Sequence, residues 1–291
     1  MRVVRLFIFL CAFLLLSIPA NAIKIGLIDS TPITYVGTST IGDVIDIKTK
    51  KIICKLEAMQ PYKFKAKKNK IYIQTNRQEY NLSSDFIAIR PTNKGFCSAK
   101  NRWYRGELIL SAQNGNLTVI NNLNIESYIR GVVPSEMPSK WDIEAHKAQA
   151  IAARSYAVAN LQKRGRRGYD LKDTPEDQAY GGASSETVQT NKACDDTKGI
   201  VLTYDQKVIP AYYSASAGGH TINSGDIWAK NLPYLKAVPS YDGNIKKNGH
   251  GVGMSQHGAN NLAKRGYNAY QILCYFYNNV KFGKLDPTWP L

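Results

Sequence analysis

The chain has 291 residues and a formal net charge of +16; 44% of its residues are hydrophobic and 21% are charged. This composition is that of a globular protein and excludes disorder as the global state. A coiled coil and a polytopic membrane protein are also excluded, because no heptad pattern persists and only one segment is continuously apolar.

The first 22 residues have the pattern of a secretory signal peptide. Two arginines precede an apolar segment over residues 6–16, and residues 20–22 read Ala-Asn-Ala, which fits a cleavage site. We expect the mature chain to begin near Ile23 and to be secreted, to the periplasm or the cell wall, with no transmembrane anchor after cleavage. An uncleaved N-terminal anchor is the alternative.

The rest of the chain is strongly basic, with lysine and arginine clusters over residues 63–70 and 163–167. A basic protein outside the cytoplasm meets anionic surfaces such as cell wall and extracellular polysaccharide. Neither cluster carries the interleaved aromatic residues of a single-strand nucleic-acid platform. We therefore expect an anionic polymer, and no specific nucleic acid, as the partner.

The cysteines and histidines give no sign of a metal or cofactor. Four cysteines follow the leader without a C-x-x-C pair, and the first pairing to test is Cys54 with Cys97. None of the four histidines combines with a cysteine at a spacing typical of zinc sites. We expect no metal and no cofactor.

Residues 23–102 predict a small β-rich region. The segments Ile23–Ile28, Val44–Ile47 and Ile71–Ile73 are rich in β-branched and aromatic residues, and Ser, Thr, Asn and Gly separate them. Nothing in this region indicates chemistry. We interpret it as a support for residues 103–291, which we expect to form a second domain.

Two features stand out in the first part of that domain. Asn114-Gly115, between two β-rich segments, is the best short hairpin signal in the chain. Further on, Pro134 and Pro138 predict a tight loop around Glu136, because each proline restrains its own backbone and that of its predecessor.

Residues 143–161 predict the one long helix, rich in alanine and free of glycine and proline. We expect Ser139 as its N-cap and Asp142 as the acidic capping-box residue. Small residues at helical spacing over 148–159 should let another backbone approach closely.

The C-terminal part predicts a hairpin of residues 199–204 and 208–214, followed by short helices over 260–265 and 269–277. The expected fold class is α+β, with mostly β-strands, one long alanine-rich helix and the small N-terminal β region.

Glu136 is the strongest candidate for chemistry. A carboxylate between two prolines is positioned rather than mobile, and functional groups often lie on loops that a scaffold fixes. The alternative is an acid that stabilises the dipole of the following helix. We interpret Glu126, a second carboxylate upstream, as structural.

Six ordered segments, from about Arg105 to the C-terminus, resemble the SpoIID/LytB domain, the stage II sporulation protein D family. They read IESYIRGVVPSEMP, AHKAQAIAARSYA, DQAYGG, TKGIVLTYD, YYSASAGGHT and GHGVGMSQHGA. Six motifs in order are far more specific than one short motif. The secretory leader and the basic charge agree with the resemblance.

The resemblance implies a peptidoglycan lytic transglycosylase in cell-wall remodelling or sporulation. Such enzymes cleave glycan strands between N-acetylmuramic acid and N-acetylglucosamine, preferably strands stripped of stem peptides, and yield 1,6-anhydro products. The family's acid lies in the SEMP motif, here Glu136, and acts first as general acid and then as general base. Relatives described as enhancers of an N-acetylmuramoyl-L-alanine amidase keep a second interpretation open, that of a non-catalytic, glycan-binding adaptor.

The other motifs imply a glycan groove, with rings and hydroxyls that suit sugar and glycines that let backbone approach it. The expected substrate-binding residues are Gln178, Tyr180, Tyr212, Tyr213, Ser214, Ser216, Gly218, Gly219, His250, Gly251 and Gln256. Gln149 and Arg154, on the long helix, are expected to hold the SEMP loop or the groove wall. Some relatives carry a zinc site, but residues 180–194 contain one cysteine and no histidine, so no zinc is carried over.

Overall fold

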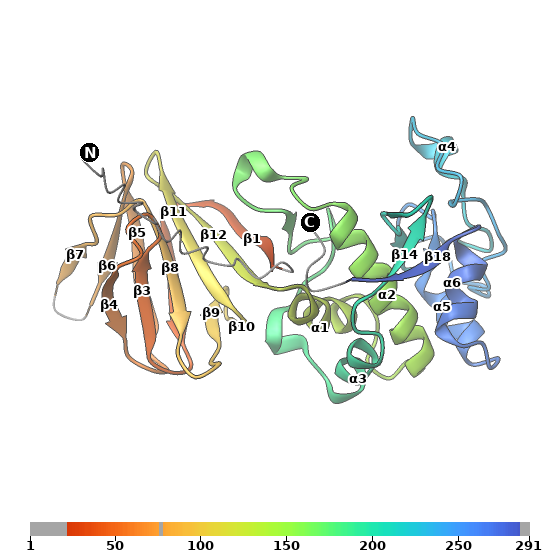
Figure 1. The fold of residues 1–291 in the computed structure, drawn as a ribbon, viewed down its shortest axis with the longest axis horizontal. Helices are drawn as coiled ribbons and strands as arrows, with labels where there is room; N and C mark the ends of the chain where they lie inside the picture. Colours follow the sequence, from red (N-terminus) through yellow and green to blue (C-terminus); the bar gives the residue numbers. More distant parts are fainter. Residues whose placement is uncertain (1–21, 76–77, 286–291) are drawn as a thin grey trace, which may run out of the picture.

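The computed structural model describes residues 22–75 and 78–285, so the expected signal peptide, apart from Ala22, lies outside the described residues. The described chain has a β-rich body at one end and most of its helices at the other (Figure 1). The α+β class expected from the sequence is confirmed. Among the described residues, no helix is long and apolar enough to cross a membrane.

Two sheets form the β-rich body, and the chain crosses from one to the other at Pro32. The first sheet has the order β13-β1-β12-β11-β8-β3-β4, with β1 (Ala22–Thr31), β3 (Gly42–Asp46), β4 (Ile52–Leu56), β8 (Phe86–Pro91), β11 (Glu107–Gln113), β12 (Asn116–Asn124) and β13 (Leu171–Lys172). The second has the order β10-β9-β2-β5-β6-β7, with β2 (Ile33–Thr38), β5 (Tyr62–Lys67), β6 (Lys70–Gln74), β7 (Glu79–Asn81), β9 (Cys97–Ala99) and β10 (Arg102–Tyr104). The first sheet takes strands from both sides of the boundary suggested at residues 102 and 103.

Alternating side chains hold these sheets together. In β5, Phe64 and Ala66 are buried while the lysines that alternate with them are more exposed, as expected of a strand with one face on the core. Buried residues of both sheets contribute to one apolar cluster. The predicted hairpin is confirmed: Asn114 and Gly115 both have positive φ, at 50° and 79°, and join β11 to β12.

The rest of the chain combines six helices of the described residues with two small sheets. The helices are α1 (Ile125–Glu136), α2 (Ile143–Ala159), α3 (Val188–Asp196), α4 (Ser224–Ile227), α5 (Gln256–Ala263) and α6 (Ala269–Phe276), with short 3₁₀ turns at Gly165–Arg167 and Gly182–Ser185. One sheet has the order β15-β14-β18, with β14 (Ile200–Tyr204), β15 (Lys207–Val208) and β18 (Lys281–Lys284). The other pairs β16 (Tyr213–Ser214) with β17 (Met254–Ser255).

Helix α2 is the predicted long helix and lies between the two main cores. Ala150 and Ala153 pack into the core of the β-rich body, and Ala148 and Ala152 pack into the core of the C-terminal part. The expected close approach is confirmed at Ser155, whose Oγ accepts a hydrogen bond of 2.8 Å from the backbone N–H of Leu202.

The N-cap prediction for α2 was wrong by three residues. Asp142, and not Ser139, caps the helix, and its carboxylate accepts a 2.9 Å hydrogen bond from the N–H of Glu144. The N–H of Trp141 bonds to the carbonyl of Pro138, so Ser139 lies inside a turn that precedes the helix.

The tight loop expected around Glu136 is instead the last turn of α1. Pro134 lies inside that helix, and Glu136 is its final residue. A proline removes only its own N–H, and the N–H of Met137 still closes the turn on the carbonyl of Val133 at 3.0 Å. Burial of Val132 and Val133 holds this turn against the core, and Pro138 follows the cap.

Three further expectations are corrected. Cys54 lies on β4 of one sheet and Cys97 on β9 of the other, and both are free thiols, as are the other cysteines that the structure describes. The strand expected over residues 208–214 breaks after Val208, since Pro210 cannot donate to a ladder. Helix α5 begins at Gln256, four residues before the expected start, because Ser255 caps it.

Candidate active site

A cavity of about 640 Å³ opens where the end of α1, the start of α5 and several loops meet. We call it the Glu136 cavity. Its lining residues are Ser135, Glu136, Tyr156, Lys163, Pro175, Glu176, Asp177, Ala179, Tyr212, Tyr213, Ser214, Ala215, Trp228, Asn248, Gly249, His250 and Gln256.

Two donors from distant segments fix the Glu136 carboxylate. The backbone N–H of Ala179 donates to Oε1 at 2.7 Å. The side-chain Nε2 of Gln256, in the first turn of α5, donates to Oε2 at 3.2 Å. The end of one helix, the start of another and the DQAYGG segment therefore meet at this carboxyl group.

Burial raises the pKa of Glu136 above its ordinary value, because removing the carboxylate from water disfavours the charged form. Hydrogen bonds from Ala179, Gln256 and Tyr213 oppose this effect and lower the pKa, but burial is the largest cause. A carboxyl group in this state can release or accept a proton closer to neutral pH than an exposed one.

Behind Glu136, a chain of buried polar groups orients Tyr213. The Nε2 of Gln178 donates to the Tyr213 hydroxyl at 2.8 Å and to the carbonyl of Ala153 at 3.2 Å. The hydroxyl of Tyr128 donates to Oε1 of Gln178 at 3.1 Å. Since the Tyr213 oxygen accepts from Gln178, its own proton remains free to face Glu136.

Glu136 is the one carboxylate of the described cavity lining without a basic partner. No lysine, arginine or histidine nitrogen of the described residues lies within 4.0 Å of it. Burial raises the pKa of Asp177, but the hydrogen bonds from Arg164 and Lys163, at 2.6 Å each, together outweigh burial and lower it. Glu176 pairs with Lys172 and Arg164. The cavity thus offers a single free acid.

Aromatic rings cover another wall of the cavity. The ring of Trp228 lies 4.5 Å from that of Tyr212 and 5.3 Å from that of His250, centre to centre. The ring of Tyr156 meets that of Tyr212 edge-on, with 5.6 Å between the ring centres. Flat apolar faces with polar edges suit the face of a sugar ring.

His250 is held as a neutral ring. Its Nδ1 accepts a hydrogen bond of 3.0 Å from the N–H of Val252, which leaves the proton on Nε2. Burial lowers its pKa, and the charge of Lys247 lowers it further. A neutral imidazole forms no ion pair with Glu136, so it can serve as an uncharged hydrogen-bonding group for a ligand.

Five of the expected substrate-binding residues line the cavity together with Glu136, the expected acid: Tyr212, Tyr213, Ser214, His250 and Gln256. Ser214 is notable because its Oγ is buried and has no hydrogen-bond partner among the described residues.

The other expected residues do not line it. Gln178 lies behind Tyr213, as described above. The ring of Tyr180 is buried, with its hydroxyl donating to Asn121 at 2.9 Å, and an added Cβ at Gly131 of α1 would lie 2.5 Å from it. The hydroxyl of Ser216 donates to the carbonyl of Lys246 at 2.6 Å. These side chains are occupied by the protein itself.

The expected glycines away from the cavity serve backbone contacts. The N–H of Gly218 donates to Asp242 at 2.8 Å, and the carbonyl of Gly219 accepts from the N–H of Ser240. The carbonyl of Gly251 accepts from Ile222 at 2.8 Å. All three glycines have positive φ.

Of the two expected supporting residues, Arg154 makes contacts other than those expected. Arg154 is fully buried and forms a bidentate ion pair with Glu126, at 2.9 and 2.7 Å, and it also donates to the carbonyl of Ile200. It therefore ties α2 to the start of α1 and to β14, not to the Glu136 turn. Gln149 is buried in α2, and its amide atoms have no hydrogen-bond partner among the described residues.

Sequence reasoning missed Trp228 and the amide of Ala179. Trp228 stands outside every motif used above, directly after α4, and only the fold brings it to the cavity. The Ala179 amide carries no side-chain signal at all. Within the described chain, no group of three or more His, Cys, Asp and Glu side chains is placed to hold a metal ion.

Part of the chain is similar in sequence to known proteins. Residues 113–204 match the sequence model of SpoIID, the stage II sporulation protein. The chain is 38% identical over 136 residues to an uncharacterized protein of Brachyspira hyodysenteriae, covering 46% of this chain and 37% of that protein. It is 44% identical over 109 residues to the amidase enhancer of Bacillus subtilis, covering 38% of this chain and 14% of that protein.

A third relative is the stage II sporulation protein D of Bacillus amyloliquefaciens, 38% identical over 136 residues, with 42% of this chain and 40% of that protein covered. The chain thus spans less than half the length of each of these three relatives. The matched region contains α1, Glu136 and α2, and these matches support a SpoIID/LytB-type domain in this part of the chain.

Proposed function

We propose that this chain is a peptidoglycan lytic transglycosylase that uses Glu136 as general acid and then general base. The observation that carries the proposal is a single unpaired carboxyl group, with a raised pKa, in a cavity walled by aromatic rings. A glycosidase that works by hydrolysis needs a second carboxylate as base or nucleophile. The other acids of this cavity are occupied by arginine and lysine.

One carboxyl group is sufficient when the substrate supplies its own nucleophile. Protonated Glu136 donates its proton to the oxygen that leaves as the glycosidic bond breaks. The resulting carboxylate takes the proton of the muramic acid C6 hydroxyl, whose oxygen bonds to the anomeric carbon and closes a 1,6-anhydro ring. The proton count balances over the two steps, and no water is consumed.

The surroundings of Glu136 suit both of its protonation states. The N–H of Ala179 and the amide of Gln256 stabilise the carboxylate that the first step creates. Burial acts in the opposite direction and favours the protonated acid that the first step requires. The aromatic wall of Trp228 and Tyr212 would hold the sugar beside this group.

The proposed substrate also suits the setting of the chain. The leader expected over residues 1–22 and the formal charge of +16 fit a protein that meets an anionic wall polymer outside the cytoplasm. In this proposal, residues 103–291 carry the catalytic function, in wall remodelling or sporulation, and the strands before them serve as support and binding surface.

A second candidate function is a non-catalytic, glycan-binding adaptor that stimulates an amidase. It is favoured by one observation, the similarity to a protein named amidase enhancer. The two candidates differ in chemistry, so the products separate them.

The test incubates the purified chain with intact and with amidase-stripped peptidoglycan and identifies the products by mass spectrometry. Glu136→Gln removes the acid, and Glu57→Gln removes an exposed acid of the β-rich body as a control for charge. We expect 1,6-anhydromuramic acid from the unaltered chain and the control, and none from Glu136→Gln. Binding without that product on either substrate would favour the adaptor.

A further inference from the structure

A second cavity, of about 620 Å³, adjoins the first, and we call it the Arg102 cavity. Three residues, Ser135, Pro175 and Ala179, line both cavities. Ser135 directly precedes Glu136, and Ala179 donates to its carboxylate. A polymer bound at Glu136 that continues past these residues therefore enters the Arg102 cavity.

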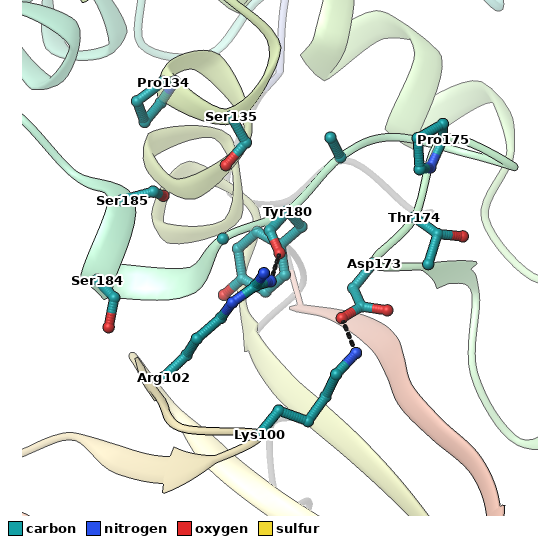
Figure 2. Close-up of a pocket in the computed structure, with 12 residues that line it drawn as sticks. Lys100, Arg102, Pro134, Ser135, Asp173, Thr174, Pro175, Tyr180, Ser184 and Ser185 are labelled. Atoms are coloured by element: carbon teal, nitrogen blue, oxygen red, sulfur yellow. Dashed lines mark hydrogen bonds and ion pairs between the residues drawn. The ribbon is translucent and has the colours of Figure 1, made fainter.

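The β-rich body supplies one wall of this cavity, as Figure 2 shows with Lys100 and Arg102 facing Asp173 and the segment of Tyr180. The ammonium group of Lys100 already has partners within the protein. Its Nζ pairs with the buried carboxylate of Asp173 at 2.6 Å and donates to the carbonyl of Leu27 at 3.0 Å. These contacts make Lys100 and Asp173 a neutral, structural pair.

Arg102, unlike Lys100, has no acidic partner among the described residues. Its guanidinium donates to the backbone carbonyl of Tyr180 at 3.4 Å, and no acidic group of the described residues lies within 4.0 Å of it. A guanidinium has five N–H donors in a planar fork that matches the two oxygens of a carboxylate. Once the Lys100–Asp173 pair is counted, Arg102 leaves the lining of this cavity with one net positive charge.

Hydroxyl groups complete the lining. Ser184 accepts a 2.8 Å hydrogen bond from the N–H of Trp103, so its own proton remains free to be donated. Ser185 and Ser135 donate to backbone carbonyls and keep their oxygens as acceptors. A cation among hydroxyl groups suits a sugar that carries an acidic substituent.

We propose that the Arg102 cavity is a further subsite of the same groove and binds a carboxylate carried by a sugar of the bound strand, beyond the bond at Glu136. This inference rests on the proposed function for the identity of the polymer. Two sources give this chemistry: the free lactyl group of a muramic acid without peptide, and a carboxylate of a stem peptide. The β-rich body then contributes directly to binding the substrate.

The experiment measures binding in the Glu136→Gln background, so that no strand is cleaved. The added variants are Arg102→Gln, Arg102→Lys and, as the control, Arg265→Gln. Arg265 is an exposed arginine that lines neither cavity, and its replacement removes the same charge. The probes are stripped glycan strands, the same strands with their carboxylates amidated, and strands that keep their stem peptides.

We expect Arg102→Gln to weaken the affinity for stripped strands about tenfold, which is the effect of losing one charged hydrogen bond. The affinity for amidated strands should change by no more than about twofold. Arg102→Lys should lose less, because it keeps the charge without the fork. A loss confined to peptide-bearing strands would assign the carboxylate to the stem peptide.

Two results would overturn the subsite: an equal loss on amidated strands, or an equal loss in Arg265→Gln. Thermal unfolding of each variant shows whether a loss of binding follows from misfolding. If Arg102→Gln is misfolded, Arg102→Lys takes its place in the comparison. Absence of anhydro products from the unaltered chain would overturn the proposed function but leave this binding result standing, so the two failures are distinguishable.

Discussion

The backbone N–H of Ala179 lies 2.7 Å from Oε1 of Glu136 and donates a hydrogen bond to it. The two residues are separated by 43 positions in the sequence. A main-chain donor persists whatever side chain it carries, so the carboxyl group keeps one fixed partner. Its other oxygen has a partner that mutation can remove, Gln256.

Replacing Gln256 should therefore shift the protonation of Glu136. The hydrogen bond from Gln256 lowers the pKa of Glu136, so Gln256→Ala should raise that pKa further. In the transglycosylase account, the high-pH limb of the rate profile reports loss of the acidic proton and should move to higher pH. Rates of anhydro-product formation across pH 4–9 check this; an unmoved limb would show that the contact does not tune the acid.

Glu136→Gln should stabilise the protein at neutral pH, because burial raises the folded-state pKa of Glu136. The stability that the protonated acid contributes is fully present below its unfolded pKa and is lost as pH rises through the raised folded value. Glutamine does not titrate. The variant's gain in free energy of unfolding should therefore grow, as pH rises through the folded-state pKa of Glu136, to about 0.5–2 kcal/mol.

Urea unfolding at pH 4 and pH 7 measures this difference, with Glu57→Gln as the matched control. If Glu136→Gln gains the same free energy of unfolding at both pH values, burial of the charged carboxylate is not the source of the gain. A loss of stability at pH 7 would assign the carboxylate a structural role and weaken the catalytic proposal.

Trp228→Ala should weaken glycan binding about tenfold, because a stacking face on the cavity wall is lost. Trp228→Phe should recover much of the affinity, since it keeps a ring against Tyr212 and His250. Isothermal titration with stripped strands tests both variants. Equal affinities for the alanine and phenylalanine variants would argue against stacking.

Arg154→Met should destabilise the fold by about 3–5 kcal/mol, because it leaves the Glu126 carboxylate without its buried bidentate partner. The double variant Arg154→Met with Glu126→Gln should recover part of that loss, since no unpaired charge remains. Urea denaturation of both variants measures the coupling. Additive losses would show that the pair does not act as a unit.

Local patterns predicted the elements that depend on local chemistry. The alanine-rich segment of α2 and the Asn114-Gly115 turn need only helix propensity and positive φ, and both were found. The conformation at Glu136 was not, because Pro134 occupies the last turn of α1, where burial of the neighbouring valines outweighs the lost hydrogen bond.

The composition of the cavity depended on tertiary contacts that no pattern reports. Tyr180 and Ser216 have the chemistry of sugar contacts, yet Asn121 and Lys246 engage their hydroxyls. Trp228 has no motif, and only the packing of the loops brings it beside Tyr212. Sequence patterns therefore pointed to Glu136, and the fold determines which side chains surround it.

The most direct test of the central claim is mass spectrometry of stripped glycan strands after incubation with the unaltered chain and with Glu136→Gln. The account predicts products ending in 1,6-anhydromuramic acid from the unaltered chain and their loss in the variant, while the variant still binds the strands. Anhydro products that persist in Glu136→Gln, or strands that bind the unaltered chain and remain uncut, would contradict it.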